Sequence, residues 1–242
     1  MALSNDELLR YQRQLTIEGW DQDKVKQSRV IVVGLGGIGG TAAMYLAAAG
    51  VGTLRLVEHD RVDVTNLNRQ IPYDTSDVGR LKLECAAGRL AALNPHVAIE
   101  PVQDVVTMEN VRLLAAGCDV IVDGLDNQPG REILNGAALA LSIPYVYGSV
   151  CGWRGSVSVF HPPRTPCMAC LTAGAPGNTP PVPALGAVAG LVGTLQAVAA
   201  LTFLNSGEIP LAGRLLLLDA LTMQFDSVLF QRSPSCPVCG SG

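Results

Sequence analysis

The side chains in this sequence that could do chemistry are cations and carboxylates that follow apolar, strand-like runs. Arg69, Lys82 and Arg131 supply cationic hydrogen-bond donors of the kind that bind phosphate groups. Asp60 and Asp126 supply the hard carboxylate oxygens that Mg²⁺ prefers. This set is suited to binding ATP together with a divalent cation. The polar residues beside it are Thr65, Asn66, Asn68, Gln70 and Asn127.

A glycine-rich turn precedes these residues and has the form of a phosphate-binding loop. Residues 30–40 are an apolar run that breaks into Gly34-x-Gly36-x-x-Gly39. Glycines permit a tight turn and a close approach of the backbone, and the helix that follows directs its N-terminal N–H groups at phosphate. Glu58 ends the next apolar run, where an acidic side chain can bind the ribose hydroxyls of NAD. The loop alone is therefore compatible with NAD, FAD or another phosphate-bearing ligand.

The residues after Glu58 favour ATP over a dinucleotide. A hydride-transfer site needs an apolar pocket for the nicotinamide ring, whereas residues 64–70 are mostly polar. Two competing hypotheses stay open at this point. One is an oxidoreductase that binds NAD or FAD, and the other is a binding scaffold without activity, which would require a degenerate ATP pocket.

Strand-like and helix-like segments alternate from residue 29 to about residue 150. This alternation predicts a mostly parallel, doubly wound α/β sheet, and the apolarity of residues 30–33 is typical of a strand covered on both faces. Ligands of such sheets bind at the carboxyl ends of the strands. The predicted strands are 29–34, 53–58, 97–102, 118–124 and 143–150, and the predicted helices are 38–50, 79–93, 108–116 and 129–142.

The pattern changes in the second half of the chain. A strand-like segment at 155–160 precedes a Pro-rich stretch at 161–183, an apolar helix at 184–204 and two strands within 214–232. We expect these strands to extend the same sheet in antiparallel fashion. The prediction is a Rossmann-like single domain of residues 1–242, with an N-terminal helical appendage (1–28), a nucleotide-binding half (29–150) and a second half (151–242).

The N-terminal residues predict a short helix. Ser4-x-x-Glu7 has the form of a capping box, in which each residue satisfies a backbone N–H group of the other. Leu8, Tyr11 and Leu15 would then share one face of the helix. We interpret this helix as separate from the sheet.

Four cysteines give the strongest metal signal. Cys167-x-x-Cys170 and Cys236-x-x-Cys239 are spaced so that each pair can hold one side of a tetrahedral Zn²⁺ ion. All four coordination positions would be filled, which indicates a structural rather than a catalytic zinc. The alternative is a coincidence of cysteine pairs or a pair of redox dithiols.

The other three cysteines carry weaker signals. Cys85 and Cys118 fall in helix and strand patterns and are predicted to be small core residues. Cys151 lies nearer the expected site, but no histidine or other base accompanies it, so a nucleophilic role is not favoured.

Composition and charge restrict the cellular setting. The formal net charge of -4 argues against nucleic acid or an anionic membrane as a partner. The N-terminus has acidic residues where a signal peptide needs a basic start, so we expect a cytoplasmic protein. Residues 184–204 are long and uncharged enough to span a membrane, but Thr194 and Gln196 lie near their middle and the flanks lack clustered Lys and Arg. We therefore predict a buried or dimer-facing helix there.

Taken in order, the motifs resemble the MoeB/ThiF/HesA family, the bacterial relatives of ubiquitin-activating enzymes. The likeness runs from about residue 4 to residue 240. The segments that carry it are Arg-Tyr-Gln-Arg-Gln (10–14), the glycine loop (34–40), Thr-Asn-Leu-Asn-Arg-Gln (65–70), Val-Gly-Arg-Leu-Lys-Leu-Glu (78–84), Asp126-Asn127 with Arg131, Gly-Thr-Leu-Gln-Ala (193–197) and the two Cys-x-x-Cys pairs.

The resemblance implies ATP-dependent adenylation of the C-terminal carboxylate of a small ubiquitin-like sulfur carrier, of the MoaD or ThiS kind, that ends in Gly-Gly. The products would be an acyl-adenylate and pyrophosphate. A peptide or another carboxylate is the alternative acceptor, and carriers of several pathways share this chemistry. The resemblance also implies a homodimer and places zinc and carrier binding in residues 151–242.

Site roles follow from the resemblance by position. Arg13, Arg69, Lys82 and Asp126 would be the catalytic residues, with Arg13 reaching the phosphates from the other subunit. Asp60 and Asp126 would hold Mg²⁺. The remaining nucleotide-binding residues would be Gly36, Gly37, Gly39, Glu58, Asn66, Gln70, Asn127 and Arg131, with Glu58 on the ribose and Asn66 on the phosphates.

The chain departs from the family in one place. Many members carry a cysteine in the loop between the first Cys-x-x-Cys pair and the long apolar helix, where this sequence has Thr179. Adenylation does not need that thiol. A later thioester or persulfide step is not implied for this chain.

Overall fold

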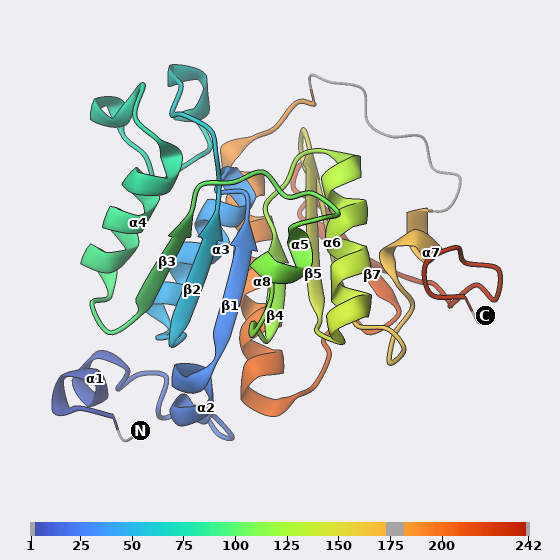
Figure 1. Cartoon of the computed structure of the whole chain (residues 1–242), viewed down its shortest axis with the longest axis horizontal. Helices are drawn as coiled ribbons and strands as arrows, with labels where there is room; N and C mark the ends of the chain where they lie inside the picture. The colour runs from blue at the N-terminus through green and yellow to red at the C-terminus, as the bar shows by residue number, and fades with distance from the viewer. Residues whose placement is uncertain (1–2, 173–181, 241–242) are drawn as a thin grey trace.

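The core of the protein is one eight-stranded sheet, seen in a computed structural model that describes residues 3–172 and 182–240 (Figure 1). The strands are β1 (Arg29–Val33), β2 (Thr53–Val57), β3 (Ala98–Val102), β4 (Val120–Asp123), β5 (Tyr145–Cys151), β6 (Arg154–Phe160), β7 (Arg214–Asp219) and β8 (Gln224–Leu229). Their order is β3-β2-β1-β4-β5-β6-β7-β8. Strands β1 to β5 pair in parallel, whereas β6, β7 and β8 are added by antiparallel pairing. The predicted Rossmann-like sheet with antiparallel C-terminal strands is therefore confirmed.

Helices cover both faces of the parallel strands. The helices are α1 (Asn5–Arg10), α2 (Gln22–Gln27), α3 (Gly37–Ala48), α4 (Lys82–Leu93), α5 (Val111–Leu114), α6 (Gln128–Leu141), α7 (Met168–Thr172) and α8 (Gly186–Ser206), with 3₁₀ turns at Val64–Asn66 and Thr75–Asp77. In Figure 1, α5 and α6 lie in front of the sheet, and α3 and α8 lie behind it.

The side chains of β1 explain why its sequence is apolar throughout. Val30 and Val32 pack into the buried cluster that contains residues of α3, α4 and α8. Ile31 and Val33 point to the opposite face and join the cluster formed with α5 and α6. Successive strand residues face opposite sides of a sheet, so a strand covered on both sides needs apolar residues at every position.

Helix α8 is the apolar segment that could be mistaken for a membrane span. It is long and apolar enough to cross a membrane, with a mean hydropathy of 1.9, and half of its most apolar stretch is buried within this chain. Val188 and Val192 pack with Val157 of β6, and Ala197 and Ala200 join the cluster that contains α3. One side of the helix packs between α3 and the sheet, as expected of a core helix, whereas Leu191 and Val198 are exposed.

Helix α4 begins later than its sequence predicts. The predicted helix starts at residue 79, but α4 begins at Lys82. The N–H of Gly79 donates to the carbonyl of Val62 at 2.8 Å, and Val62 in turn donates to the carbonyl of Arg80 at 2.9 Å. These bonds, together with the φ of +87° at Gly79, hold residues 79–81 outside the helical conformation, so the helix starts only after them. The predicted helix 108–116 is likewise reduced to the single turn of α5.

The N-terminal segment forms the predicted capping box but not the predicted apolar face. Ser4 and Glu7 cap α1 reciprocally, as expected. The helix ends at Arg10, and of the three apolar residues only Tyr11 is buried, while Leu8 is exposed. The Tyr11 hydroxyl accepts a hydrogen bond from Asn94 at 2.8 Å, which anchors the chain after the helix has ended. The shared face of Leu8, Tyr11 and Leu15 was therefore a wrong prediction.

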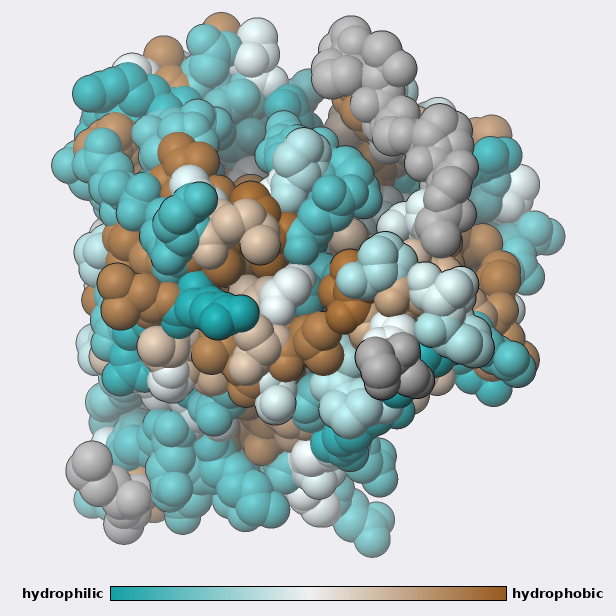
Figure 2. Space-filling model, turned by 45° about the vertical axis from the view of Figure 1, so that its right-hand side comes forward, coloured by the Kyte–Doolittle hydropathy of each residue, from teal (hydrophilic) through white to brown (hydrophobic). Residues whose placement is uncertain are grey.

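Several apolar side chains remain on the surface. Figure 2 shows hydrophobic residues gathered near the centre of one face, among hydrophilic ones. In the C-terminal hairpin, Leu221, Met223, Phe225, Val228 and Leu229 are exposed, and every residue of β8 is exposed. Strand β8 is the last strand of the sheet on this side. The hairpin thus presents apolar surface that no other described part of the chain covers.

Glu7 ties α1 to α2 and predicts an acid-sensitive contact. Its carboxylate lies 2.8 Å from the Lys26 ammonium and accepts the N–H of Ser4. Burial opposes the charge, but the bonds from Lys26 and Ser4 outweigh burial and lower the pKa of Glu7 from 4.5 to about 2. A carboxyl whose pKa is lowered by folding stabilises the fold above its unfolded pKa, and this stabilisation is lost as the pH falls towards 2.

We expect Glu7→Gln to lower the free energy of unfolding by about 2 kcal/mol at pH 7, since it removes a hydrogen-bonded charge pair. The difference from wild type should shrink between pH 4.5 and 2. Urea unfolding followed by circular dichroism at several pH values measures it, with the exposed Asp23→Asn as control. A difference that stays constant over this pH range would contradict the assignment.

Candidate functional site

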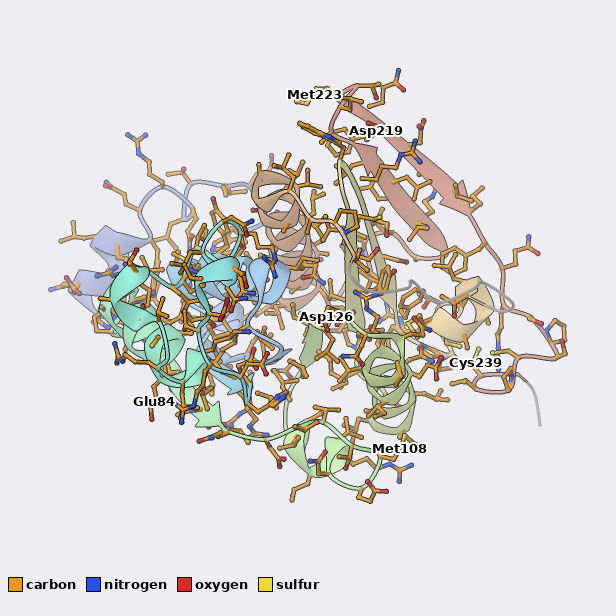
Figure 3. All side chains as sticks on the ribbon, turned by 90° about the horizontal axis from the view of Figure 1, so that it is seen from above. Glu84, Met108, Asp126, Asp219, Met223 and Cys239 are labelled. Carbon is orange, nitrogen blue, oxygen red and sulfur yellow. The ribbon has the colours of Figure 1, made fainter. Side chains whose placement is uncertain are left out.

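A cavity of about 440 Å³ opens where β1 and β4 end. This is the carboxyl edge of the parallel strands, where the ligand was expected. Figure 3 looks onto this end of the molecule, with Asp126 near its centre. The predicted site residues that line the cavity are Gly36, Gly37, Asp60, Arg69, Gln70, Lys82, Asp126, Asn127 and Arg131.

Beneath the cavity lies a junction of three glycines, of which Gly34 and Gly124 line it. Val33 pairs with Asp123 at the ends of β1 and β4, so Gly34 and Gly124 follow side by side. The N–H of Gly124 donates to the carbonyl of Val33 at 2.7 Å. A Cβ atom on Gly124 or on Gly39 would overlap the carbonyl oxygen of Gly34, and Gly34 has a φ of +85°. Only glycine therefore allows the two strand ends and the start of α3 to meet so closely.

Helix α3 directs the N–H groups of its first turn at the cavity. Its N-cap is Gly36, which makes no side-chain capping bond. The first N–H groups of a helix lack partners within the helix and carry partial positive charge, so they suit a phosphate. Gln70 lies beside this turn, and its buried Oε1 has no hydrogen-bond partner within the described residues. Both features leave polar groups available to a bound ligand.

Charged side chains enclose the other walls. Lys82, the first residue of α4, is buried, and its ammonium lies 3.0 Å from a carboxylate oxygen of Asp60. The Asp60 side chain remains 54% exposed, so it can still contact a cation. Arg69 donates from Nη1 to the carbonyl of Thr65 at 2.8 Å and to Asn68 at 3.0 Å. These local bonds hold the Arg69 side chain at the cavity wall.

Asp126 and Asn127 follow β4 in the loop that leads into α6. Asn127 is the N-cap of α6, and its side-chain oxygen accepts the N–H of Gly130 at 2.9 Å. Asp126 is exposed, and Asn127 donates to it at 3.4 Å. The Asp126 carboxylate is thus directed by the backbone of the loop and is available to a ligand.

Three predicted residues lie close to the cavity without lining it. Gly39 belongs to the glycine junction. Glu58 is buried, and its carboxylate accepts the N–H groups of Leu35, His59 and Asp60 at 2.8 to 3.0 Å. Asn66 caps its own 3₁₀ turn. The assignments of Glu58 to ribose and of Asn66 to phosphate stay predictions.

Arg13 lies in the segment between α1 and α2, which is at the opposite end of the sheet from the carboxyl ends of the strands (Figure 1). Residues before and after Arg13 are anchored to the rest of the fold. Tyr11 is buried, and Gln14 donates to the carbonyl of Ala49 at 2.9 Å, whereas Arg13 is exposed. A second hollow, of about 270 Å³ and mostly apolar, lies beside Gln14 between α3 and α8.

Two charged residues that the sequence analysis did not pair form a buried ion pair at the cavity wall. Asp123 is fully buried, and Arg131 Nε donates to its carboxylate at 3.1 Å. The Tyr145 hydroxyl donates to the same oxygen at 2.8 Å. Burial raises the pKa of Asp123, and the neighbouring Arg131 opposes that shift. An acidic residue inside the apolar run 118–124 was the available signal for this pair.

The four paired cysteines come together as predicted. The Sγ atoms of Cys167, Cys170, Cys236 and Cys239 all lie within 4.8 Å of one another. Neighbouring sulfurs are 3.4 to 3.9 Å apart, which matches the ~3.8 Å edge of a tetrahedron with Zn–S bonds of about 2.3 Å. This cluster could hold a metal ion. It joins α7 to the C-terminal segment, apart from Asp126 (Figure 3).

The other cysteines are placed as the sequence suggested. Cys85 and Cys118 are buried, and burial raises the pKa of both thiols, that of Cys118 to about 11. Cys151 is exposed at the end of β5, next to the cavity-lining Val150. The predicted position of the missing family cysteine, Thr179, lies outside the described residues.

Comparisons with known proteins agree with this geometry. Residues 11–238 match the ThiF family. The chain is 42% identical to a sulfur carrier protein adenylyltransferase of Thermus thermophilus, over 99% of this chain and 93% of that protein. It is 38% identical to the molybdopterin-synthase adenylyltransferase of Escherichia coli, over 98% of both chains.

A solved structure with a similar fold is that of E. coli MccB. It superposes with a TM-score of 0.85 and covers 99% of this chain and 74% of the MccB chain, at 22% sequence identity. At that identity the likeness concerns the fold. It supports the order of strands and helices described above.

Proposed function

This chain belongs to the ThiF family, and from that premise we propose that it adenylates the C-terminal Gly-Gly carboxylate of a small ubiquitin-like sulfur-carrier protein. ATP is consumed, and the products are the acyl-adenylate and pyrophosphate. The observation that carries the proposal is the cavity at the end of β1 and β4. It combines a glycine floor and an open helix N-terminus with Arg69, Lys82 and two carboxylates.

The chemistry requires charge stabilisation rather than proton transfer. A C-terminal carboxylate has an ordinary pKa of about 3.5, so the nucleophile is already ionised at neutral pH. Its oxygen attacks the α-phosphorus, the bond to the β-phosphate breaks, and pyrophosphate leaves with the electron pair. No general base is needed, in agreement with a cavity whose lining contains no histidine among the described residues.

The residues that lower this barrier are the cations and the acids of the cavity. Arg69 and Lys82 neutralise the triphosphate, and the N–H groups of α3 contact it. Asp60 and Asp126 carry the oxygen ligands for a Mg²⁺ ion, which would screen charge between the carboxylate and the phosphates when bound. Asp60 is held in place by Lys82, which leaves Asp126 as the less constrained acid.

We place the docking of the carrier on residues 151–242. The exposed apolar side chains of the β7–β8 hairpin belong to this half. Figure 3 shows Asp219 and Met223 of the hairpin on one side of Asp126. The folded body of a carrier could cover these side chains while its extended tail enters the cavity, whose lining from this half includes Val182 and Ala184. We also propose a cytoplasmic location, because thiols such as those of the four-cysteine cluster stay reduced there.

Arg69→Ala and Asp126→Ala are each expected to lower ATP–pyrophosphate exchange by about 10²- to 10³-fold, the usual loss for one electrostatic donor in an active site. Exchange should require a carrier with an intact Gly-Gly tail, and intact mass should show AMP on its C-terminus. The exposed Arg112→Ala, on α5, is the matched control and should keep full exchange.

Other results would overturn this assignment. Exchange without a Gly-Gly-tailed partner, or AMP attached to a peptide or another carboxylate, would change the acceptor. Thermal stabilisation by NADH instead of MgATP would favour the oxidoreductase. Stabilisation by MgATP with no exchange by any carrier would favour a binding scaffold.

We propose that the four-cysteine cluster holds a structural Zn²⁺ ion. The spacing of the sulfurs fits tetrahedral coordination, and four protein ligands leave no open position for a substrate. The cluster links α7 with the last described residues of the chain, so the metal would fix the C-terminal segment beside α6. Binding of this kind contributes on the order of 10 kcal/mol to folding.

The purified protein should contain one zinc ion per chain by elemental analysis. Cys236→Ser should lose the metal and lower the melting temperature, because a three-ligand site binds zinc more weakly. Cys151→Ser removes an exposed thiol outside the cluster and should retain the ion. Equal zinc contents in the two variants would contradict the site.

We further propose a homodimer in which Arg13 serves the cavity of the partner. Tyr45 and Val198, on the outer surfaces of α3 and α8, are more than half exposed although both are apolar. The hollow between these helices reaches Gln14, next to Arg13. Dimerisation through this face would bury the apolar residues and bring Arg13 of each subunit into the interface.

Mixing Arg13→Ala with Asp126→Ala subunits tests this arrangement. If Arg13 acts in trans, a mixed dimer contains one complete site, and a random mixture should regain about one quarter of wild-type exchange. Each variant alone should stay inactive. A mixture that remains inactive after subunit exchange, or a protein that is monomeric by light scattering at assay concentration, would contradict the proposal.

A further inference from the structure

We propose that Asp123, Arg131, Tyr145 and Gln196 form a buried network that positions the Asp126 loop, defined as residues 124–127, for catalysis. The inference rests on the proposed adenylation and extends it. Asp123, Tyr145 and Gln196 are positioning residues, because they are fully buried and do not line the cavity. Arg131 does line the cavity, and it acts in the network through its bonds to Asp123 and to the loop backbone.

Asp123 holds the loop from the strand side. One oxygen of its carboxylate accepts the N–H of Leu125 at 2.8 Å. The other oxygen accepts Arg131 Nε at 3.1 Å and the Tyr145 hydroxyl at 2.8 Å. The carboxylate is therefore fixed by two side chains from α6 and β5, and it transfers that fixed position to the backbone of the loop.

Arg131 holds the same loop from the helix side. Its Nη2 donates to the carbonyl of Leu125 at 2.8 Å and to the carbonyl of Gly148 at 3.1 Å. Its guanidinium carbon lies 5.2 Å from the centre of the Tyr147 ring. Both backbone polar groups of Leu125 are thus bound by side chains, and Asp126 is the next residue.

Gln196 supports the network from the opposite face of the sheet. The parallel ladder between β4 and β5 ends at the pair Val122 and Val146. Beyond it, Gln196 Nε2 donates to the carbonyls of Asp123 at 2.8 Å and of Val146 at 3.1 Å. A Cβ atom on Gly148 would lie 2.6 Å from this nitrogen, so the glycine leaves room for the amide.

Asp126 depends on this scaffold because little else directs it. Within the described residues, its side chain accepts one hydrogen bond, from Asn127 at the long distance of 3.4 Å. An exposed carboxylate on an unsupported loop would sample many directions. Misplacement by about 1 Å can lower a reaction rate about 100-fold, so the rigid backbone of Leu125 matters to the chemistry.

The rival assignment makes Arg131 a direct ligand of the phosphates. Nη1 carries the two N–H groups that are not used by Asp123, Leu125 and Gly148. The two assignments predict different energetic coupling between Arg131 and Tyr145. A direct ligand would act independently of Tyr145, whereas network members should show strongly non-additive effects.

Tyr145→Phe and Gln196→Met test the network without touching the cavity. Each should lower kcat for carrier-dependent ATP–pyrophosphate exchange about tenfold, with the KM for MgATP changed by less than about twofold. Hydrogen–deuterium exchange of the peptide that contains residues 124–127 should become faster. The control is Ser158→Ala, which removes a buried hydroxyl bond to the carbonyl of Arg214 and should leave kcat unchanged.

The double variant of Arg131→Ala and Tyr145→Phe should be no slower than Arg131→Ala alone. Effects that multiply, or single variants with wild-type kcat and unchanged hydrogen exchange, would overturn the proposal. If the wild-type protein shows no exchange with any carrier, the proposed function fails. Hydrogen exchange of the loop needs no turnover, so unchanged protection in Tyr145→Phe would still refute the network by itself.

Discussion

The contact between the backbones of Gly34 and Gly124 is the constraint on which the site depends. It places the ends of β1 and β4 side by side, closer than any residue with a Cβ atom would allow. The start of α3 follows from β1 and the Asp126 loop follows from β4, so one contact sets the distance between them. Replacing either glycine would separate the helix N-terminus from the loop without altering a charged residue.

The charged residues of the cavity belong to segments that are far apart in sequence but meet at the same edge of the sheet. Lys82 begins α4, Asp60 follows β2, and Asp126 follows β4. A parallel sheet brings such residues together because all of its strands end on one side. Lys82 is buried but paired with Asp60, which reduces the cost of burying its charge in a site made for anions.

Much of this fold could be predicted from local patterns, because alternating apolar runs determine strands and helices. The glycine loop, the cysteine pairs and the cavity charges could also be identified from the sequence, since each has a distinctive residue type and spacing. The start of α4 could not be predicted in this way, because it is set by hydrogen bonds between Val62 and residues 79 and 80, which are distant in sequence. The burial of Tyr11 depends on Asn94, which no helical periodicity could reveal. Asp123 and Arg131 were visible as charges, but their pairing required the fold.

The buried pair of Asp123 and Arg131 is difficult to explain by stability alone. Removing two charges from water is costly, and apolar side chains of similar size often stabilise a core as well or better. This pair lies where β4 ends, and its hydrogen bonds reach both backbone groups of Leu125. An apolar pair at this place would fill the same volume but could not fix the direction of the peptide that precedes Asp126. We infer that the charge pair is present because it fixes the direction of this peptide, a role that packing of apolar side chains could not fill.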